Sequence, residues 1–239
     1  MNYALVDVGN TSIKVKVFNQ NLSEVSSFDL NKSEKSLNHF FNLEKIEKYL
    51  ISSVVPELNE KVLKINPKKC CFLNHNDFSD LKINVSPIES VGIDRLVNAI
   101  AIKYKWDANV LVVDIGTAIT FCKINKGGIY DGGIICPGFQ MITSALNEKT
   151  AQLPQIQFPL IQPNIIGKST KTAIESGLFH GSISMINGLI NDCKKKNKTL
   201  SVVLTGGVPS CLLKYINHDV FEKDLQFIGL DILYKQKFL

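Results

Sequence analysis

Residues 110–121 have the sequence Val-Leu-Val-Val-Asp-Ile-Gly-Thr-Ala-Ile-Thr-Phe, and the start of the chain follows the same plan. There the apolar stretch Tyr3–Val6 leads into Asp7-Val8-Gly9-Asn10-Thr11, and Ile13–Val17 then alternates between apolar and polar residues. Each copy is typical of a strand, a turn that contains Asp, Gly and Thr, and a second strand with one buried face. A unit that occurs twice predicts two related halves.

The rest of the chain predicts strands and helices around these two units, from apolar runs and from apolar residues at helical spacing. Residues 104–109 form the expected boundary, which gives an N-terminal half of residues 1–105 and a C-terminal half of residues 106–239. The further strands are expected over residues 25–28, 51–55, 70–73 and 202–205. The helices are expected over residues 32–41, 57–65 and 172–190, and from near residues 93, 138 and 227.

Both Asp-x-Gly-x-Thr turns are suited to phosphate. The glycine removes side-chain bulk, and the turn amides and the hydroxyl can then point at one place. An aspartate at the strand end can hold a hydrated cation that bridges phosphates. A Gly-Asn turn is also an ordinary hairpin signal, so the interpretation depends on there being two copies and on the glycine turn Gly206-Gly207, which could lie against adenine or ribose. The candidate residues are Asp7, Val8, Gly9, Asn10, Thr11, Ser12, Ile13 and Lys14 in the first copy, and Asp114, Gly116, Thr117 and Thr120 in the second.

The segment Val91-Gly92-Ile93-Asp94-Arg95 contains the only arginine of the chain. A guanidinium binds carboxylate or phosphate through two parallel hydrogen bonds, which an ammonium cannot do. Asp94 is its neighbour, and Gly92 lets the backbone approach a ligand. The alternative is an Asp–Arg pair of little consequence at a helix start. In that case the buried face of the helix is formed by Leu96, Val97, Ile100 and Ala101.

A Walker A loop is rejected for Gly167-Lys168-Ser169-Thr170. That loop needs a glycine five positions earlier, where this chain has Gln162, and it needs a strand immediately before it. The preceding residues 150–164 instead include three prolines, so an irregular connection is expected there.

Composition restricts the class of protein. With 239 residues, of which 45% are hydrophobic, the chain can bury a substantial core. The net charge of +5 is spread along the chain without interleaved aromatic residues, so no nucleic-acid partner is expected. The six cysteines form no Cys-x-x-Cys pair, and the four histidines are expected in packing or surface roles. We expect a cytoplasmic protein with free thiols, without a signal peptide or a membrane-spanning segment.

The order of these motifs resembles that of the type III pantothenate kinases, which belong to the actin-like, sugar-kinase-like ATPase superfamily. The motifs that carry the resemblance are Asp7–Thr11, Gly92–Arg95, Asp114–Thr117, Gly132–Gly138 and Thr205–Gly207, with Ile51–Pro56 and Thr150–Pro154. The match spans nearly the whole chain. It implies an α/β fold with two ribonuclease-H-like halves and an active cleft between them.

The resemblance also implies an activity: phosphorylation of pantothenate by ATP, the first step of coenzyme A biosynthesis. It implies a homodimer, Mg²⁺ and a monovalent cation, K⁺ or NH₄⁺. The Asp7–Lys14 turn and Thr117 would hold the nucleotide phosphates, and Asp114 would ligate the monovalent cation. Gly92, Ile93, Asp94 and Arg95 would bind pantothenate, with Asp94 as the base, and Thr170 would reach pantothenate in the partner subunit's site.

Two departures from the family pattern affect the substrate contacts. The family often has Arg-Asn-Thr where this chain has Lys168-Ser169-Thr170, and often has a tyrosine in the region of Asn84–Ser86. Two other functions stay open: another small-molecule kinase of the superfamily, or a non-catalytic regulatory homologue. A protein that had lost turnover should show changes at Asp7, Asp94 or Asp114, and this chain has all three.

Overall fold

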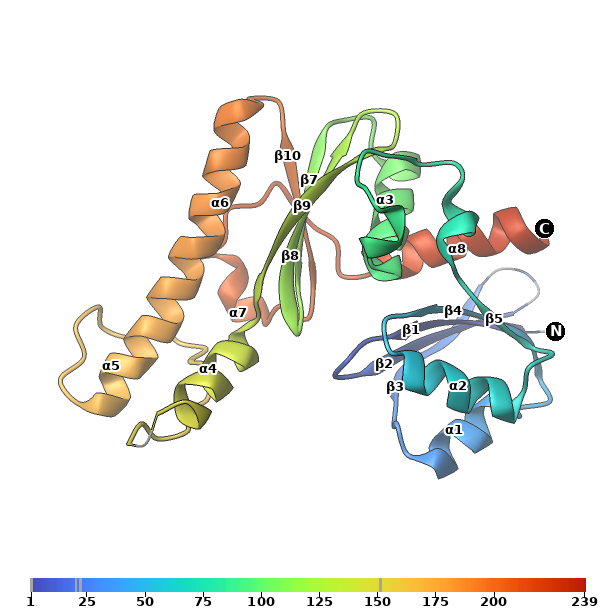
Figure 1. Ribbon diagram of the computed structural model, residues 1–239, viewed down its shortest axis with the longest axis horizontal. Coiled ribbons are helices and arrows are strands. Elements are labelled where there is room, and N and C mark those ends of the chain that lie inside the picture. The colour runs from blue at the N-terminus through green and yellow to red at the C-terminus, as the bar shows by residue number, and fades with distance from the viewer. Residues whose placement is uncertain (1, 20, 22, 151) are drawn as a thin grey trace. The chain divides into compact units, whose positions relative to one another are not determined.

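The computed structural model describes residues 2–19, 21, 23–150 and 152–239. The chain forms two compact units, and each contains one sheet (Figure 1). The first unit consists of Met1–Asp107, Gly127–Tyr130 and Asp224–Leu239, and the second of Ala108–Lys126 and Asp131–Lys223. The first unit therefore includes the C-terminal segment Asp224–Leu239, which a single boundary near residue 105 would place in the other half.

The sheet of the first unit has the strand order β3-β2-β1-β4-β5. Its central strand β1 pairs antiparallel with β2 on one side and parallel with β4 on the other, and β5 is parallel to β4. The strands are β1 (Asn2–Val8), β2 (Ile13–Phe18), β3 (Glu24–Leu30), β4 (Ile46–Ser53) and β5 (Cys70–Phe72).

Helices cover both faces of this sheet (Figure 1). Alternate residues of β1, such as Ala4 and Val6, share a buried core with Leu37 and Phe41 of α1 on one face. On the other face Tyr3 stacks on Tyr234 of α8, with 3.8 Å between ring centroids. The helices are α1 (Glu34–Phe41), α2 (Pro56–Ile65), α3 (Ile93–Lys105) and α8 (Leu225–Phe238), with short 3₁₀ turns η1 (His75–Phe78) and η2 (Ile88–Ser90).

The sheet of the second unit repeats this topology. The full order of the sheet is β11-β10-β7-β8-β9-β6, and its central strand β7 pairs antiparallel with β8 and parallel with β10. The short strand β6 (Lys82–Ile83) pairs with the first residues of β9, which belong to the first unit. The strands are β7 (Val110–Ile115), β8 (Ala118–Asn125), β9 (Ile129–Pro137), β10 (Ser201–Gly206) and β11 (Val220–Phe221). The predicted duplication of one strand plan is therefore confirmed.

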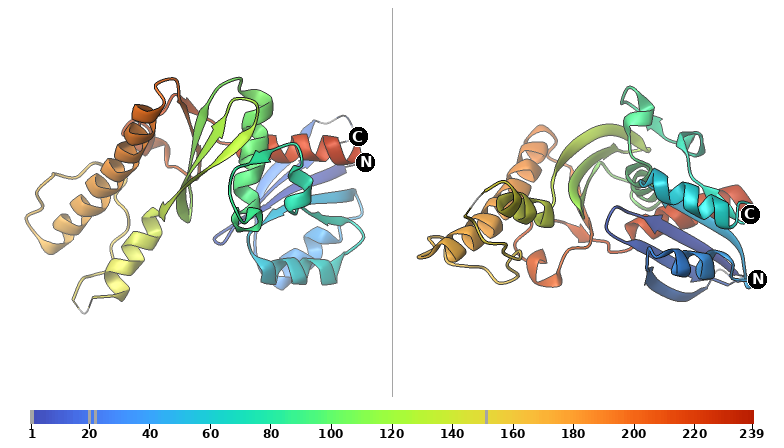
Figure 2. Two further views of the ribbon diagram at one scale, coloured as in Figure 1. Left: turned by 45° about the horizontal axis from the view of Figure 1, so that its top comes forward. Right: turned by 60° about the horizontal axis from the view of Figure 1, so that its bottom comes forward.

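A long helical run packs on the second sheet, where Phe179 and Ile186 share a core with Val113 and Phe121. The prediction of one helix over residues 172–190 was wrong in its detail. The run is α5 (Thr170–Ser176), a π turn (Gly177–Gly181) and α6 (Ser182–Lys196). Figure 2 shows this run as the long orange helix. The π turn lies between two glycines, which favour such an interruption because they cost helical stability. The remaining helices are α4 (Phe139–Glu148) and α7 (Ser210–Leu213).

Residues 152–169 form neither helix nor strand, in agreement with the expected irregular connection and with the rejection of a Walker A loop. Ala151 of the Thr150–Pro154 motif lies outside the described residues. No helix in the described part of the chain is both long enough and apolar enough to cross a bilayer.

Candidate active site

The first Asp-x-Gly-x-Thr turn joins β1 to β2. Val8 and Ile13 are the last paired residues of the hairpin, and the amide of Gly9 donates to the Ser12 carbonyl at 3.0 Å. A Cβ placed on Gly9 would lie 3.4 Å from that carbonyl oxygen, with no other atom within 4 Å apart from its chain neighbours. Packing within the protein therefore does not require glycine at position 9. The open space beside it is suited to close approach by a ligand.

The end of β1 carries polar side chains on the face opposite the α1 core. Asp7 is paired with Lys14 of β2 and with Ser52 of β4, so the three side chains share one face of the sheet. Ser52 is fully buried, and Gln226 of α8 donates from Nε2 to its Oγ at 3.2 Å. Gln226 was missed by the sequence analysis, because nothing in its local pattern marks it.

The predicted substrate motif forms the start of α3. Gly92 is the N-cap residue and Asp94 lies in the first turn. The Asp94 carboxylate folds back and accepts hydrogen bonds from the backbone amides of Arg95 and of Asp94 itself. A Cβ on Gly92 would overlap the Asp94 Oδ1 atom, so glycine is required for this carboxylate position. Burial raises the pKa of Asp94 above its usual range, against the opposing effect of the amides and of the Arg95 charge.

The loop before α3 is held by two side chains. Arg95 donates from Nη2 to the Ser90 carbonyl at 3.2 Å, and His75 Nε2 lies 2.9 Å from the Val91 carbonyl oxygen. A carbonyl can only accept, so His75 donates from Nε2. The sequence predicts only a packing or surface role for His75, and nothing in its local pattern marks this contact with the motif.

The alternative interpretation of this motif is correct about the helix face. Leu96, Val97, Ile100 and Ala101 of α3 are all fully buried. That burial fixes α3 on its unit and leaves the helix start, with Asp94 and Arg95, partly exposed.

The second Asp-x-Gly-x-Thr turn joins β7 to β8, and its neighbour in space is the predicted glycine turn. Asp114 is paired with Thr120 of β8 and with Thr205 of β10. Gly206 has φ +94°, and a Cβ there would overlap Asp114 Oδ1 and approach the Ile115 carbonyl oxygen. The structure thus brings Asp114 and Gly206-Gly207 together.

These oxygens suit a hard cation. The Asp114 carboxylate and the Ile115 carbonyl both border Gly206, and carboxylate and carbonyl oxygens are the ligands that such cations take. Within the described residues, no group of three or more His, Cys, Asp and Glu side chains is placed to hold a metal ion. A cation at Asp114 would therefore need backbone oxygens or the substrate for its other ligands.

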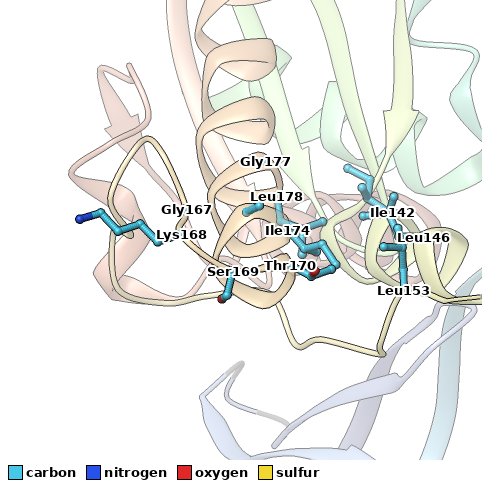
Figure 3. A pocket seen from close by; sticks show the side chains of 11 residues that line it. Ile142, Leu146, Leu153, Gly167, Lys168, Ser169, Thr170, Ile174, Gly177 and Leu178 are labelled. Carbon is cyan, nitrogen blue, oxygen red and sulfur yellow. The ribbon is translucent and has the colours of Figure 1, made fainter.

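Thr170 lies at the start of α5 and lines a cavity of about 820 Å³ in the second unit. Ser169 caps the helix, accepting from the Thr172 amide at 3.2 Å. The cavity is mainly apolar, with Ile142 and Leu146 of α4 opposite α5, and Lys168 extends away from it (Figure 3). The predicted residues are divided between the units. The first contains Asp7–Lys14 and Gly92–Arg95, and the second contains Asp114, Thr117, Thr170 and Gly206-Gly207.

Comparison with known proteins decides the family. The family model of the type III pantothenate kinases matches residues 4–192. The chain belongs to the type III pantothenate kinase family. A relative of this family from Sulfurihydrogenibium sp. is 36% identical over 208 residues, covering 82% of this chain and 81% of its own length. Another from Persephonella marina is 33% identical and covers 96% of each chain.

Solved structures agree with the fold. The crystal structure of a Baf-family protein from Campylobacter jejuni matches over 98% of each chain, with 26% identity and a TM-score of 0.64. A ROK-family glucokinase from Streptomyces griseus matches over 99% of this chain and 100% of its own, with 11% identity and a TM-score of 0.57, and it shows the fold alone. The predicted α/β fold with two related halves is confirmed.

Membership of the type III pantothenate kinase family also confirms the predicted enzyme class, a phosphotransferase acting on an alcohol group.

Proposed function

We propose that this protein catalyses the ATP-dependent phosphorylation of pantothenate to 4'-phosphopantothenate, the first step of coenzyme A biosynthesis, with Asp94 as the general base. The proposal rests chiefly on the surroundings of Asp94. Burial at the start of α3 raises the pKa of this carboxyl group, and a base is most effective when its pKa lies near the operating pH. Family membership supports the choice of substrate.

The chain's own residues position the reactants. Asp94 takes the proton of the primary hydroxyl of pantothenate while that oxygen forms a bond to the γ-phosphorus of ATP. The bond between the γ-phosphorus and the β–γ bridging oxygen breaks, and ADP leaves. The amides of the Gly9–Ser12 turn, Lys14 and Thr117 bind phosphate oxygens of ATP. Such a reaction is accelerated mainly by positioning and by neutralising charge.

Cations complete the proposed site. Asp114 would be the ligand for K⁺ or NH₄⁺, and Asp7 would hold the hydrated Mg²⁺ that accompanies ATP. The ion would supply neutralisation of the charge on the phosphates, and the single Asp7 carboxylate would be enough to hold it, because Mg²⁺ sites usually retain several water ligands. The oxygen atoms around Gly206 support the assignment of Asp114.

Arg95→Lys tests whether the substrate motif needs a guanidinium. We expect KM for pantothenate to rise about tenfold or more, because an ammonium cannot make two parallel hydrogen bonds to the substrate. KM for ATP should change little. Steady-state kinetics with each substrate varied in turn measures both, and unchanged pantothenate kinetics would show that a single charge is enough.

We further propose a homodimer in which a second copy of this chain covers the cavity beside Thr170. The support is the number of large apolar residues exposed in the same unit, with Ile161 85% and Ile166 76% exposed. Exposed apolar side chains that form a contiguous patch mark interaction sites. The others are Ile135, Met141, Leu160 and Ile165.

Ile166→Asp tests the dimer. A buried charge at an apolar contact is costly, so we expect the variant to sediment as a monomer and to lose affinity for pantothenate if Thr170 serves the partner's site. Leu63→Asp, on the exposed side of α2 in the first unit, is the matched control and should stay dimeric. A wild-type protein that sediments as a monomer would rule out the proposal.

One coupled assay decides between the proposed function and its alternatives. Purified protein with ATP, Mg²⁺, K⁺ and pantothenate should produce ADP in proportion to phosphopantothenate. ADP production only with another alcohol would identify a different small-molecule kinase. Nucleotide binding without turnover of any acceptor would identify a regulatory homologue. The cytoplasmic location and the absence of a nucleic-acid partner stay predictions from composition.

A further inference from the structure

Lys32, which follows β3, contacts the first Asp-x-Gly-x-Thr turn from behind. Its ammonium donates to the Gly9 carbonyl at 2.9 Å and to the Asn10 carbonyl at 2.6 Å. Lys32 is partly buried and belongs to the same unit as the turn. Both are charge-assisted hydrogen bonds, which are stronger than those between neutral groups.

These two bonds fix the direction of two amides. In a planar trans peptide, the carbonyl of one residue and the N–H of the next point in opposite directions. Because Lys32 holds the carbonyls of Gly9 and Asn10, the N–H groups of Asn10 and Thr11 are directed away from it. Successive amides that point to one side form a concavity that binds anions.

Lys32 adds to the backbone hydrogen bond that closes this turn. The turn spans four residues, and a backbone hydrogen bond runs across it from the Gly9 amide to the Ser12 carbonyl. Gly9 also has room to rotate, since the nearest atom to a Cβ would be 3.4 Å away. A peptide plane next to glycine can turn over at low cost, and the amide would then be lost to the ligand.

In the second unit the corresponding turn is also held on its carbonyl side, but by a backbone amide and not by a lysine. There the amide of Gly138, the N-cap of α4, donates to the Thr117 carbonyl at 3.1 Å. A Cβ on Gly138 would overlap the carbonyl oxygens of Gly116 and Thr117, so this approach requires glycine. Both turns are therefore held on their carbonyl side, one by a backbone amide and the other by Lys32.

We propose that Lys32 is a positioning residue that keeps the first turn in its anion-binding form, with the Asn10 and Thr11 amides directed at a phosphate of the nucleotide. This inference rests on the proposed function, in which the turn binds the phosphates of ATP. It adds a residue that acts through the backbone of the turn, without itself having to touch the substrate.

Lys32→Met tests the inference, because methionine keeps much of the side-chain length and removes all donors. We expect the dissociation constant for ADP, measured by calorimetry without turnover, to rise about tenfold or more. KM for ATP should rise in parallel, while KM for pantothenate stays unchanged. Lys35→Met is the matched control, because Lys35 is exposed on α1 and carries the same charge three residues away. It should bind ADP as the wild type does.

Lys32→Arg separates positioning from a general loss of folding. Its guanidinium can donate to both carbonyls, so it should restore most of the affinity for ADP. Unchanged ADP affinity in Lys32→Met, or equal losses in Lys32→Met and Lys35→Met, would overturn the inference. Failure of the wild-type protein to bind ADP or ATP would instead overturn the proposed function of the turn, so the two failures can be told apart.

Discussion

Asp94→Asn should lower kcat by about 10²–10⁴-fold, the usual contribution of a positioned general base. The amide keeps the size of the side chain and an acceptor oxygen, but it cannot take the hydroxyl proton. Affinity for ADP should change little, because Asp94 is assigned to the acceptor and not to the nucleotide. Steady-state kinetics and calorimetry measure the two effects, and normal turnover of the variant would show that Asp94 is not the base.

The same substitution should not destabilise the protein. Burial raises the pKa of Asp94 in the folded state, so the native protein binds this proton more tightly than the unfolded chain does. The free energy of unfolding then falls as the pH rises from the pKa of Asp94 in the unfolded chain to its higher pKa in the folded protein. Above the folded-state pKa, the loss of stability caused by burying the charged carboxylate is complete. Asparagine removes this penalty, so urea denaturation at neutral pH should give an equal or higher stability.

The pH profile gives a further check on Asp94. The acid limb of kcat/KM should lie above the usual carboxyl pKa of about 4, because the base must be ionised and its pKa is raised. Asp192→Asn is a suitable control, since Asp192 pairs with Lys195 on an exposed part of α6. Its profile should match that of the wild type.

Gly206→Ala should cost about 2–4 kcal/mol of stability, from a positive φ angle and from overlap with neighbouring backbone. The added Cβ would displace Asp114, against which Gly206 packs. We therefore expect loss of the dependence on K⁺ as well as a lower midpoint of urea unfolding.

Gly207→Ala is the matched control for this prediction. A Cβ at Gly207 meets nothing closer than the Ile115 carbonyl oxygen at 4.0 Å. Its stability should change by less than about 0.5 kcal/mol. Equal effects of the two alanines on unfolding would mean that the close packing of Gly206 on Asp114 does not determine stability here.

The duplicated strand plan could be predicted from sequence because it is local. Each copy puts its strand, turn and alternating strand within about a dozen residues, where periodicity and turn chemistry act directly. The glycine turns are visible for the same reason. The sheet order on either side of β1 and β7 then follows from one repeated topology.

Residues that act over long sequence distances could not be predicted in this way. Lys32 is one lysine among many, and its role depends on where β3 ends relative to Gly9. Gln226 reaches Ser52 across 174 positions, and His75 reaches the loop before α3 through the capped η1 turn. None of these contacts leaves a local pattern, because the tertiary fold alone brings the partners together.

The membership of α8 in the first unit has a similar cause. Gly229 packs against Val97 of α3 so closely that a Cβ would overlap the Val97 carbonyl oxygen. This contact joins two helices that are far apart in the chain, and the local pattern of each helix does not contain it.

The order of synthesis gives this arrangement a consequence for biogenesis. One side of β1 and β4 is covered by α8, whose residues emerge only after every strand of the second unit has been made. Until α8 has been translated, an apolar side of the N-terminal sheet stays uncovered. We therefore expect chaperones to bind this apolar side in nascent chains but not in completed, folded chains. A fragment ending at residue 107 lacks α8 and should aggregate when expressed alone.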